Sequence, residues 1–256
     1  MQTALFILSP LEQFEVVPLL SIMIPVLGSF VLAITNLTLY CALTVGLVVG
    51  LHVVGNNNHR LVPSRWSLAI ESAVASISGM VRDQIGSRYE IYTPFIYSLF
   101  MFILLANLNG NIPYGYTVTT SGVAALGLSV FVFIAVTILG LWLHGVHFFS
   151  FFVPEGTPLP LAPMLVLIET VSYLARAASL GVRLFSNMTA GHTLLKILAT
   201  FLTKLFGAGL VIAVVTLIPF AIFVALIGLE LAVSLIQSYV FCVLTCSYLK
   251  DAIQLH

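Results

Sequence analysis

Arg183 stands in the middle of a mostly apolar run of roughly forty residues from Pro163 to Gly207. A guanidinium keeps its charge at any accessible pH. Holding it at the centre of a bilayer costs about 2.5–3.5 kcal/mol on insertion scales and about 10–17 kcal/mol in simulations. Arg183 therefore has to face protein or water, which limits the chain to folds in which apolar helices carry a protected polar face.

Other polar residues share the helical face of Arg183. Glu169 and Arg176 precede it at intervals of seven residues, and each interval drifts by only about 20° around an α-helix. Ser172, Ser179, Ser186 and Asn187 widen this polar stripe. A stripe of this kind marks a face turned away from lipid. Two interpretations stay open: an ion path, or an ion pair that holds helices together.

The composition indicates an integral membrane protein. Of 256 residues, 60% are hydrophobic and 7% are charged, and the mean hydropathy is +1.14, whereas soluble domains carry roughly 25% charged residues. Nine basic residues balance nine acidic ones, so the basic surface that nucleic-acid binding requires is missing. We expect the lipid bilayer as a partner and no nucleic acid.

The apolar runs predict an all-α, polytopic fold in one membrane domain. Residues 1–25 form an N-terminal segment, and residues 26–54 are long enough for a first span. Residues 60–88 alternate apolar and polar positions as an interfacial amphipathic helix does, with Trp66 as its anchor. Residues 92–143 predict a helical hairpin, and residues 164–251 predict a hairpin of two long helices.

Basic residues set the expected orientation. Four of the nine, Arg60, Arg65, Arg82 and Arg88, lie in one stretch, and no base precedes them. Basic loops stay on the side from which a membrane protein is inserted. Residues 55–90 are therefore expected to face the matrix or cytoplasm.

The last two apolar segments are too long for upright spans. Each has nearly forty residues and would be roughly 60 Å long as a helix, twice the hydrocarbon thickness. Either each breaks into two short helices or each is steeply inclined, and the lack of proline inside the first segment favours inclination. Folding the pair about residue 208 brings Arg183 opposite residues 231–237.

The same folding predicts two titratable clusters with Arg183 between them. His192 meets Glu230, and Glu169 meets Tyr248 and Asp251. The second long segment has its own polar stripe, formed by Glu230, Ser234, Gln237, Ser238, Thr245 and Tyr248. Histidine and carboxylates exchange protons with water, whereas arginine does not. The sequence therefore predicts a proton path interrupted by a fixed cation.

Several motifs at these positions resemble subunit a of mitochondrial F-type ATP synthases. They are RLFSNMTAGH at 183–192, Ile168-Glu169, Gly228-Leu229-Glu230 and VLTCSYLKD at 243–251, and SPLEQFE at 9–15 is similar to fungal members. The resemblance runs essentially from end to end. It implies a non-catalytic stator of the mitochondrial inner membrane, with two offset half-channels held against a rotating c-ring. The peripheral stalk and other membrane-sector subunits are further implied partners.

The resemblance also implies roles for individual residues. Arg183 matches the essential arginine of the family. His192 and Glu230 would belong to the half-channel from the intermembrane space, Glu169 and Asp251 to the one toward the matrix, and Asn187 and Gln237 would flank the arginine. Arg176, Tyr248 and Ser234 have either a structural or a channel role. A short leader cut before Ser9 is a further expectation.

Other functions have weaker support. A secondary transporter with a polar site at the midplane predicts an inverted repeat with matching Gly/Pro interruptions, and the sequence has neither. A membrane enzyme needs a nucleophile or paired histidines inside spans, and His192 is the only deeply placed histidine. His144 and His147 have a spacing that could bind metal, but histidines at helix ends are usually solvated or capping. No metal site or cofactor is predicted.

Overall fold

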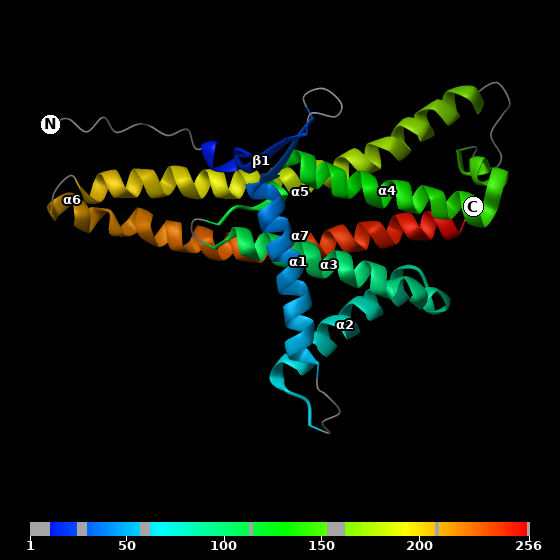
Figure 1. Cartoon of the computed structure of the whole chain (residues 1–256), viewed down its shortest axis with the longest axis horizontal. Helices are drawn as coiled ribbons and strands as arrows, with labels where there is room; N and C mark the ends of the chain where they lie inside the picture. Colours follow the sequence, from blue (N-terminus) through cyan, green and yellow to red (C-terminus); the bar gives the residue numbers. More distant parts are fainter. Residues whose placement is uncertain are drawn as a thin grey trace.

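The computed structural model describes residues 11–24, 30–56, 62–112, 115–152, 162–207 and 210–254. A short β-hairpin precedes a set of helices that make up most of the chain (Figure 1). In order, the elements are η1 (Glu12–Phe14), β1 (Pro18–Ile24), β2 (Phe30–Thr35), α1 (Asn36–Gly55), α2 (Arg65–Gln84), η2 (Ser87–Tyr92), α3 (Thr93–Gly110), η3 (Val118–Thr120), α4 (Gly122–His144), η4 (Gly145–Phe152), α5 (Ala162–Phe206), α6 (Leu210–Val215) and α7 (Leu217–Ile253). Within the described ranges, five helical segments are long and apolar enough to cross a membrane. The prediction of an all-α, polytopic membrane protein is confirmed.

The helices α5 and α7 form the long axis of the molecule. They have 45 and 37 residues and lie side by side in opposite directions, while α1 runs across them in this view (Figure 1). The alternative in which the first long segment breaks into two short helices is wrong, because α5 is continuous. The second segment is divided into α6 and α7. Pro219 accounts for that division, because its ring clashes with the carbonyl of Val215, the last residue of α6.

The fold point of the long pair lies further along the chain than predicted. The midpoint between His192 and Glu230 is residue 211, and that between Arg176 and Asp251 is between 213 and 214. Folding about residue 208 was therefore several residues too early. The reason is that the connection is not a tight turn, since α6 continues the chain before α7 begins.

The predicted first span, residues 26–54, starts too early. Residues Phe30–Thr35 form β2, which pairs antiparallel with β1, and α1 begins only at Asn36. The side chain of Thr35 accepts a hydrogen bond from the backbone of Thr38, which caps the helix. The Asn36 side chain bonds the backbone of Glu15 and Val17. These contacts fix the change from strand to helix, which a short apolar run does not reveal.

Helix α2 lies within the predicted amphipathic segment. Ser64 caps its start by accepting a hydrogen bond from the backbone of Ser67. One face buries Ile77, Met80 and Val81, and the remaining positions are largely exposed. Its placement at a membrane surface remains a prediction, and Arg60 lies outside the described residues.

The helices α3 and α4 do not form the hairpin predicted for residues 92–143. Both helices are present, but they hardly touch each other. Instead α3 packs on α7 and α1, whereas α4 packs on α5 and α7. Gly181 of α5 leaves room for the backbone of α4 to approach closely at Ala125 and Leu126.

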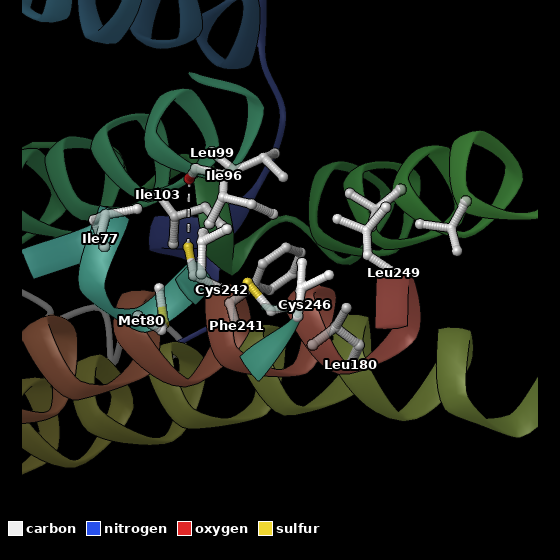
Figure 2. Close-up of a cluster of buried hydrophobic side chains, with 14 of the residues drawn as sticks. Ile77, Met80, Ile96, Leu99, Ile103, Leu180, Phe241, Cys242, Cys246 and Leu249 are labelled. Atoms are coloured by element: carbon white, nitrogen blue, oxygen red, sulfur yellow. Dashed lines mark hydrogen bonds between the residues drawn. The ribbon is translucent and has the colours of Figure 1, made fainter. Parts of the chain in front are cut away.

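A hydrophobic core gathers around one face of α7 (Figure 2). Its labelled members are Ile77 and Met80 of α2, Ile96, Leu99 and Ile103 of α3, Leu180 of α5, and Phe241, Cys242, Cys246 and Leu249 of α7. Cys242 donates a weak hydrogen bond to the carbonyl of Ile96, at 3.7 Å. The buried cysteines therefore act as small hydrophobic residues, and the core fixes which face of α7 turns toward α5.

Candidate functional site

A buried acid–histidine pair joins the two long helices. Nδ1 of His192, on α5, lies 3.1 Å from Oε1 of Glu230, on α7. Glu230 is only 6% exposed. The other ring nitrogen of His192, Nε2, lies 3.0 Å from the hydroxyl of Thr117, in the loop before η3. The structure thus brings together the first predicted cluster and adds a loop residue to it.

A polar network holds this cluster against α3. The Thr119 hydroxyl donates to Oδ1 of Asn107 at 2.8 Å, and Asn107 donates in turn to the carbonyl of Ser234 at 3.4 Å. Asn111 donates to the hydroxyl of Ser234 at 2.8 Å, and that hydroxyl bonds the carbonyl of Glu230. Because Asn107, Thr119 and Ser234 are buried, their mutual bonds offset the cost of removing them from water. Ser234 therefore supports the turn of α7 that carries Glu230.

The carboxylate of Glu230 is tightly enclosed but incompletely bonded. A Cβ at Gly191 would come within 3.0 Å of Oε1, so the glycine leaves room for the acid. Although His192 is close, its approach does not give Oε1 a well-aligned hydrogen bond, and the buried Nε2 of Gln237 also has no bonding partner in the described part of the chain. Buried polar atoms of this kind are the ones that internal water satisfies.

A second charged cluster lies toward the other end of the long pair. The Arg176 guanidinium lies 2.8 Å from Oδ2 of Asp251 and 3.7 Å from Oε1 of Glu169. The Tyr248 hydroxyl makes a long contact of 3.5 Å with the carbonyl of Arg176. All three charged side chains are about one third exposed. The predicted neighbours Glu169 and Asp251 thus meet through Arg176, which pairs with both carboxylates.

A neutral pair stands between the clusters. The Asn187 side chain donates to Oε1 of Gln237 at 2.8 Å, which joins α5 to α7. Neither amide carries a charge, so this contact separates the two titratable clusters. Asn187 is one helical turn from Arg183 along α5.

Arg183 is exposed, and among the described residues it makes no ion pair or hydrogen bond. The predicted position of Arg183 opposite residues 231–237 is several residues too early along α7. The shifted fold point explains this, because it brings Arg183 to the level of Cys242 rather than of Gln237. His192 follows Arg183 by nine residues, which is about half a revolution around the helix after whole turns are removed. The two residues therefore lie on opposite flanks of α5.

Some residues of the site were not predicted. Thr117 carries no sequence signal, because its contact with His192 depends on how the loop folds back. Gly191 could have been found, since a glycine next to a functional histidine suggests a close approach. The centroid of the Phe14 ring, in η1, lies 6.4 Å from that of the His192 ring.

The histidines considered for metal binding have another environment. Nε2 of His144 lies 3.1 Å from the carbonyl of Ile253. This carbonyl is at the end of α7, where the carbonyls have no hydrogen-bond partner within the helix. This contact fits the capping interpretation. No group of three potential metal ligands occurs within the described ranges.

Comparison with known proteins decides the family. The family described as ATP synthase A chain matches residues 38–250. An ATP synthase subunit a from Mycosarcoma maydis is 65% identical over 253 residues, covering 99% of this chain and 100% of the relative. The chain belongs to the family of ATP synthase subunit a. Further subunit a proteins, from Marchantia polymorpha and Saccharomyces cerevisiae, are 46% and 43% identical, with 97–98% of this chain and 97–99% of each relative aligned.

Membership in the subunit a family confirms the resemblance drawn from the motifs at 183–192 and 243–251, including its fungal character. The family assignment and the five long apolar segments make the chain a multi-pass subunit of the ATP synthase membrane sector. The secondary-transporter alternative is thereby set aside. Family membership does not assign roles to individual residues.

Proposed function

We propose that this subunit is the proton-conducting stator of a mitochondrial ATP synthase in the inner membrane. It forms two offset half-channels against the c-ring and works together with the peripheral stalk and other membrane-sector subunits. His192 and Glu230 serve the half-channel from the intermembrane space, and Glu169 and Asp251 serve the one toward the matrix. Arg183 separates the two.

One observation carries the proposal: Arg183 is an exposed fixed charge on an apolar helix and is left without an ion pair or hydrogen bond by the described residues. An arginine in a spanning helix needs a compensating group. The other arginine of α5, Arg176, has two carboxylates beside it. A carboxylate of a neighbouring subunit is the natural partner for Arg183, and a passing series of c-ring carboxylates supplies one in turn.

The position of Arg183 supports its role as a barrier. It is about 10 Å along α5 from Arg176 and about 14 Å from His192, at 1.5 Å per residue. The polar groups on either side are on different flanks of the helix, so a proton cannot pass between them along one face. A fixed cation between them also repels protons, because it cannot be neutralised.

The same geometry gives a direction to proton flow. A c-ring carboxylate next to Arg183 is favoured in its charged form, because an opposite charge lowers the pKa of a carboxyl. It would release its proton on one side of Arg183 and take up a new one on the other. Each proton that crosses 100 mV releases about 2.3 kcal/mol, which is available for rotation as long as no continuous water path joins the two sides.

The test replaces Arg183 by alanine and measures proton-driven ATP synthesis in membrane vesicles, normalised to the amount of assembled complex. We expect synthesis to be lost while the complex still assembles. Arg82→Ala is the control, because Arg82 is an exposed arginine on α2 that pairs with Glu90, and it should retain synthesis. Coupled synthesis at the normal rate in Arg183→Ala would refute the proposed barrier.

The half-channel assignment has its own test. Glu230→Gln keeps the size of the side chain and removes its ability to take up and release a proton. We expect slower proton uptake from the intermembrane-space side, with a normally assembled rotor and stator. A normal rate of ATP-driven proton pumping would contradict the role of Glu230 but leave that of Arg183 standing.

A further inference from the structure

The loop between α3 and α4 contributes one side chain directly to the His192–Glu230 cluster. Thr117 is 4% exposed, and its hydroxyl lies 3.0 Å from Nε2 of His192. The opposite ring nitrogen faces Glu230. The ring therefore has a hydrogen bond to the loop at one nitrogen, while its other nitrogen faces the carboxylate on α7.

The loop holds the Thr117 side chain firmly in place. Gly110, at the end of α3, is so close that a Cβ there would lie 2.2–2.6 Å from three side-chain atoms of Thr117. The hydroxyl of Thr120 donates to the carbonyl of Thr117 at 2.7 Å. The bond from Thr119 to Asn107 ties the same loop to α3. Thr117 is thus placed by packing and by bonds on each side of it.

Hydroxyl chemistry suits this position. A neutral imidazole carries one N–H, either on Nδ1 or on Nε2. When the proton is on Nδ1, toward Glu230, Nε2 can accept a hydrogen bond from Thr117. When the proton is on Nε2, the ring can donate to the oxygen of Thr117. A hydroxyl therefore bonds both tautomers, whereas a methyl group bonds neither.

We propose that Thr117 is a positioning residue of the proton path, which holds the His192 ring with one nitrogen toward Glu230 in either tautomer. This inference rests on the proposed role of His192 and Glu230. The groups that the structure places against the ring are Thr117 from the loop, Glu230 from α7 and the aromatic ring of Phe14 from η1. Glu230 is the titratable one among them. Lys196, one turn further on, is the nearest charged residue along α5.

The experiment compares Thr117→Val with Thr117→Ser in membrane vesicles that contain the whole complex. Valine keeps the shape of threonine and removes the hydroxyl, whereas serine keeps the hydroxyl. Rates of ATP-driven proton pumping are recorded against the pH on the side that serves Glu230, and are normalised to assembled complex. Thr200→Val is the matched control, because the Thr200 hydroxyl is exposed and bonds only the backbone of its own helix.

We expect Thr117→Val to pump roughly two- to tenfold more slowly, the range that corresponds to one lost hydrogen bond, and to shift the midpoint of its pH–rate profile. Thr117→Ser and Thr200→Val should match the unmodified complex in both. The inference is overturned if Thr117→Val has an unchanged rate and profile. It is equally overturned if the serine and valine variants lose the same activity with an unshifted profile, because the hydroxyl would then be irrelevant.

Glu230→Gln, measured in the same vesicles, distinguishes a failure of the Thr117 role from a failure of the half-channel assignment. If Glu230→Gln slows pumping and Thr117→Val does not, the positioning role of Thr117 fails and the half-channel assignment stands. If Glu230→Gln pumps normally, the half-channel assignment itself fails, and the role of Thr117 fails with it.

Discussion

Glu230 and Gly191 face each other across the contact between α7 and α5. A Cβ built on Gly191 would lie 3.0 Å from Oε1 of Glu230 and 3.3 Å from its Cδ. The carboxylate thus packs against Gly191, next to His192, the residue that follows this glycine in the chain. The position of the acid depends on the absence of a side chain at Gly191 as well as on the nearby ring of His192.

Gly191→Ala is expected to push the Glu230 carboxylate away by a few tenths of an ångström, because 3.0 Å is shorter than a normal carbon–oxygen contact. The 3.1 Å distance between Oε1 and Nδ1 of His192 would then change, and proton-driven ATP synthesis should fall roughly two- to tenfold, an effect of the size of one polar contact. The measurement is the rate of synthesis per assembled complex.

Gly127→Ala, in α4, provides the control for that substitution. A Cβ at Gly127 meets nothing within 4 Å, and both substitutions favour helix by about 1 kcal/mol. Gly127→Ala should therefore keep the normal rate. Equal rates in the two variants would contradict this prediction, because they would show that the Glu230 carboxylate accommodates a methyl group at position 191.

Arg176 is expected to stabilise the fold through its shared ion pair. Arg176→Gln would leave Glu169 and Asp251 without their common cation. In a double-mutant cycle with Asp251→Asn, the coupling energy should be about 0.5–3 kcal/mol, as for groups in direct contact. Unfolding free energies from denaturant titration in detergent give this value.

The Arg82–Glu90 pair offers the comparison for this cycle. Its side chains are 60% and 41% exposed, against 31% and 34% for Arg176 and Asp251. Exposed pairs contribute about 0–1 kcal/mol, so its coupling should be the smaller of the two. If the Arg82–Glu90 coupling equals or exceeds that of Arg176–Asp251, the structural role assigned to Arg176 is wrong.

Gly181 is expected to set the distance between α4 and α5. A Cβ there would lie 3.0 Å from Cα of Leu126 and 3.1 Å from the carbonyl oxygen of Ala125. These are backbone atoms, which cannot move aside individually. Gly181→Ala should therefore destabilise the protein by about 1–3 kcal/mol, the usual cost of overpacking, measured by denaturant titration.

Gly46→Ala, in α1, is the matched variant for Gly181→Ala. A Cβ at Gly46 has open space around it, so the substitution should be neutral or slightly stabilising through helix propensity. The proposed close approach of α4 and α5 is contradicted if Gly181→Ala is as stable as Gly46→Ala.

Local patterns predicted the membrane class, the long helices and the pairing of His192 with Glu230. The His192–Glu230 pairing follows from folding two helices back on each other, and it could be predicted even though the fold point was wrong by a few residues. The same error misplaced Arg183, because a shift of a few residues moves a side chain to another level and another flank. The start of α1 was also misjudged, since a short apolar run fits a strand as well as a helix.

The sequence by itself determined that the chain crosses a membrane several times and that two long apolar helices carry stripes of polar and charged residues. Apolar length and the fixed charge of arginine are properties of the residues, so they need no knowledge of distant contacts. Only the tertiary structure decided that Arg176 bridges two carboxylates, that Thr117 reaches His192 and that Arg183 is left exposed on the other flank. Those outcomes depend on helix rotation and loop packing, which are set by contacts between residues far apart in the chain.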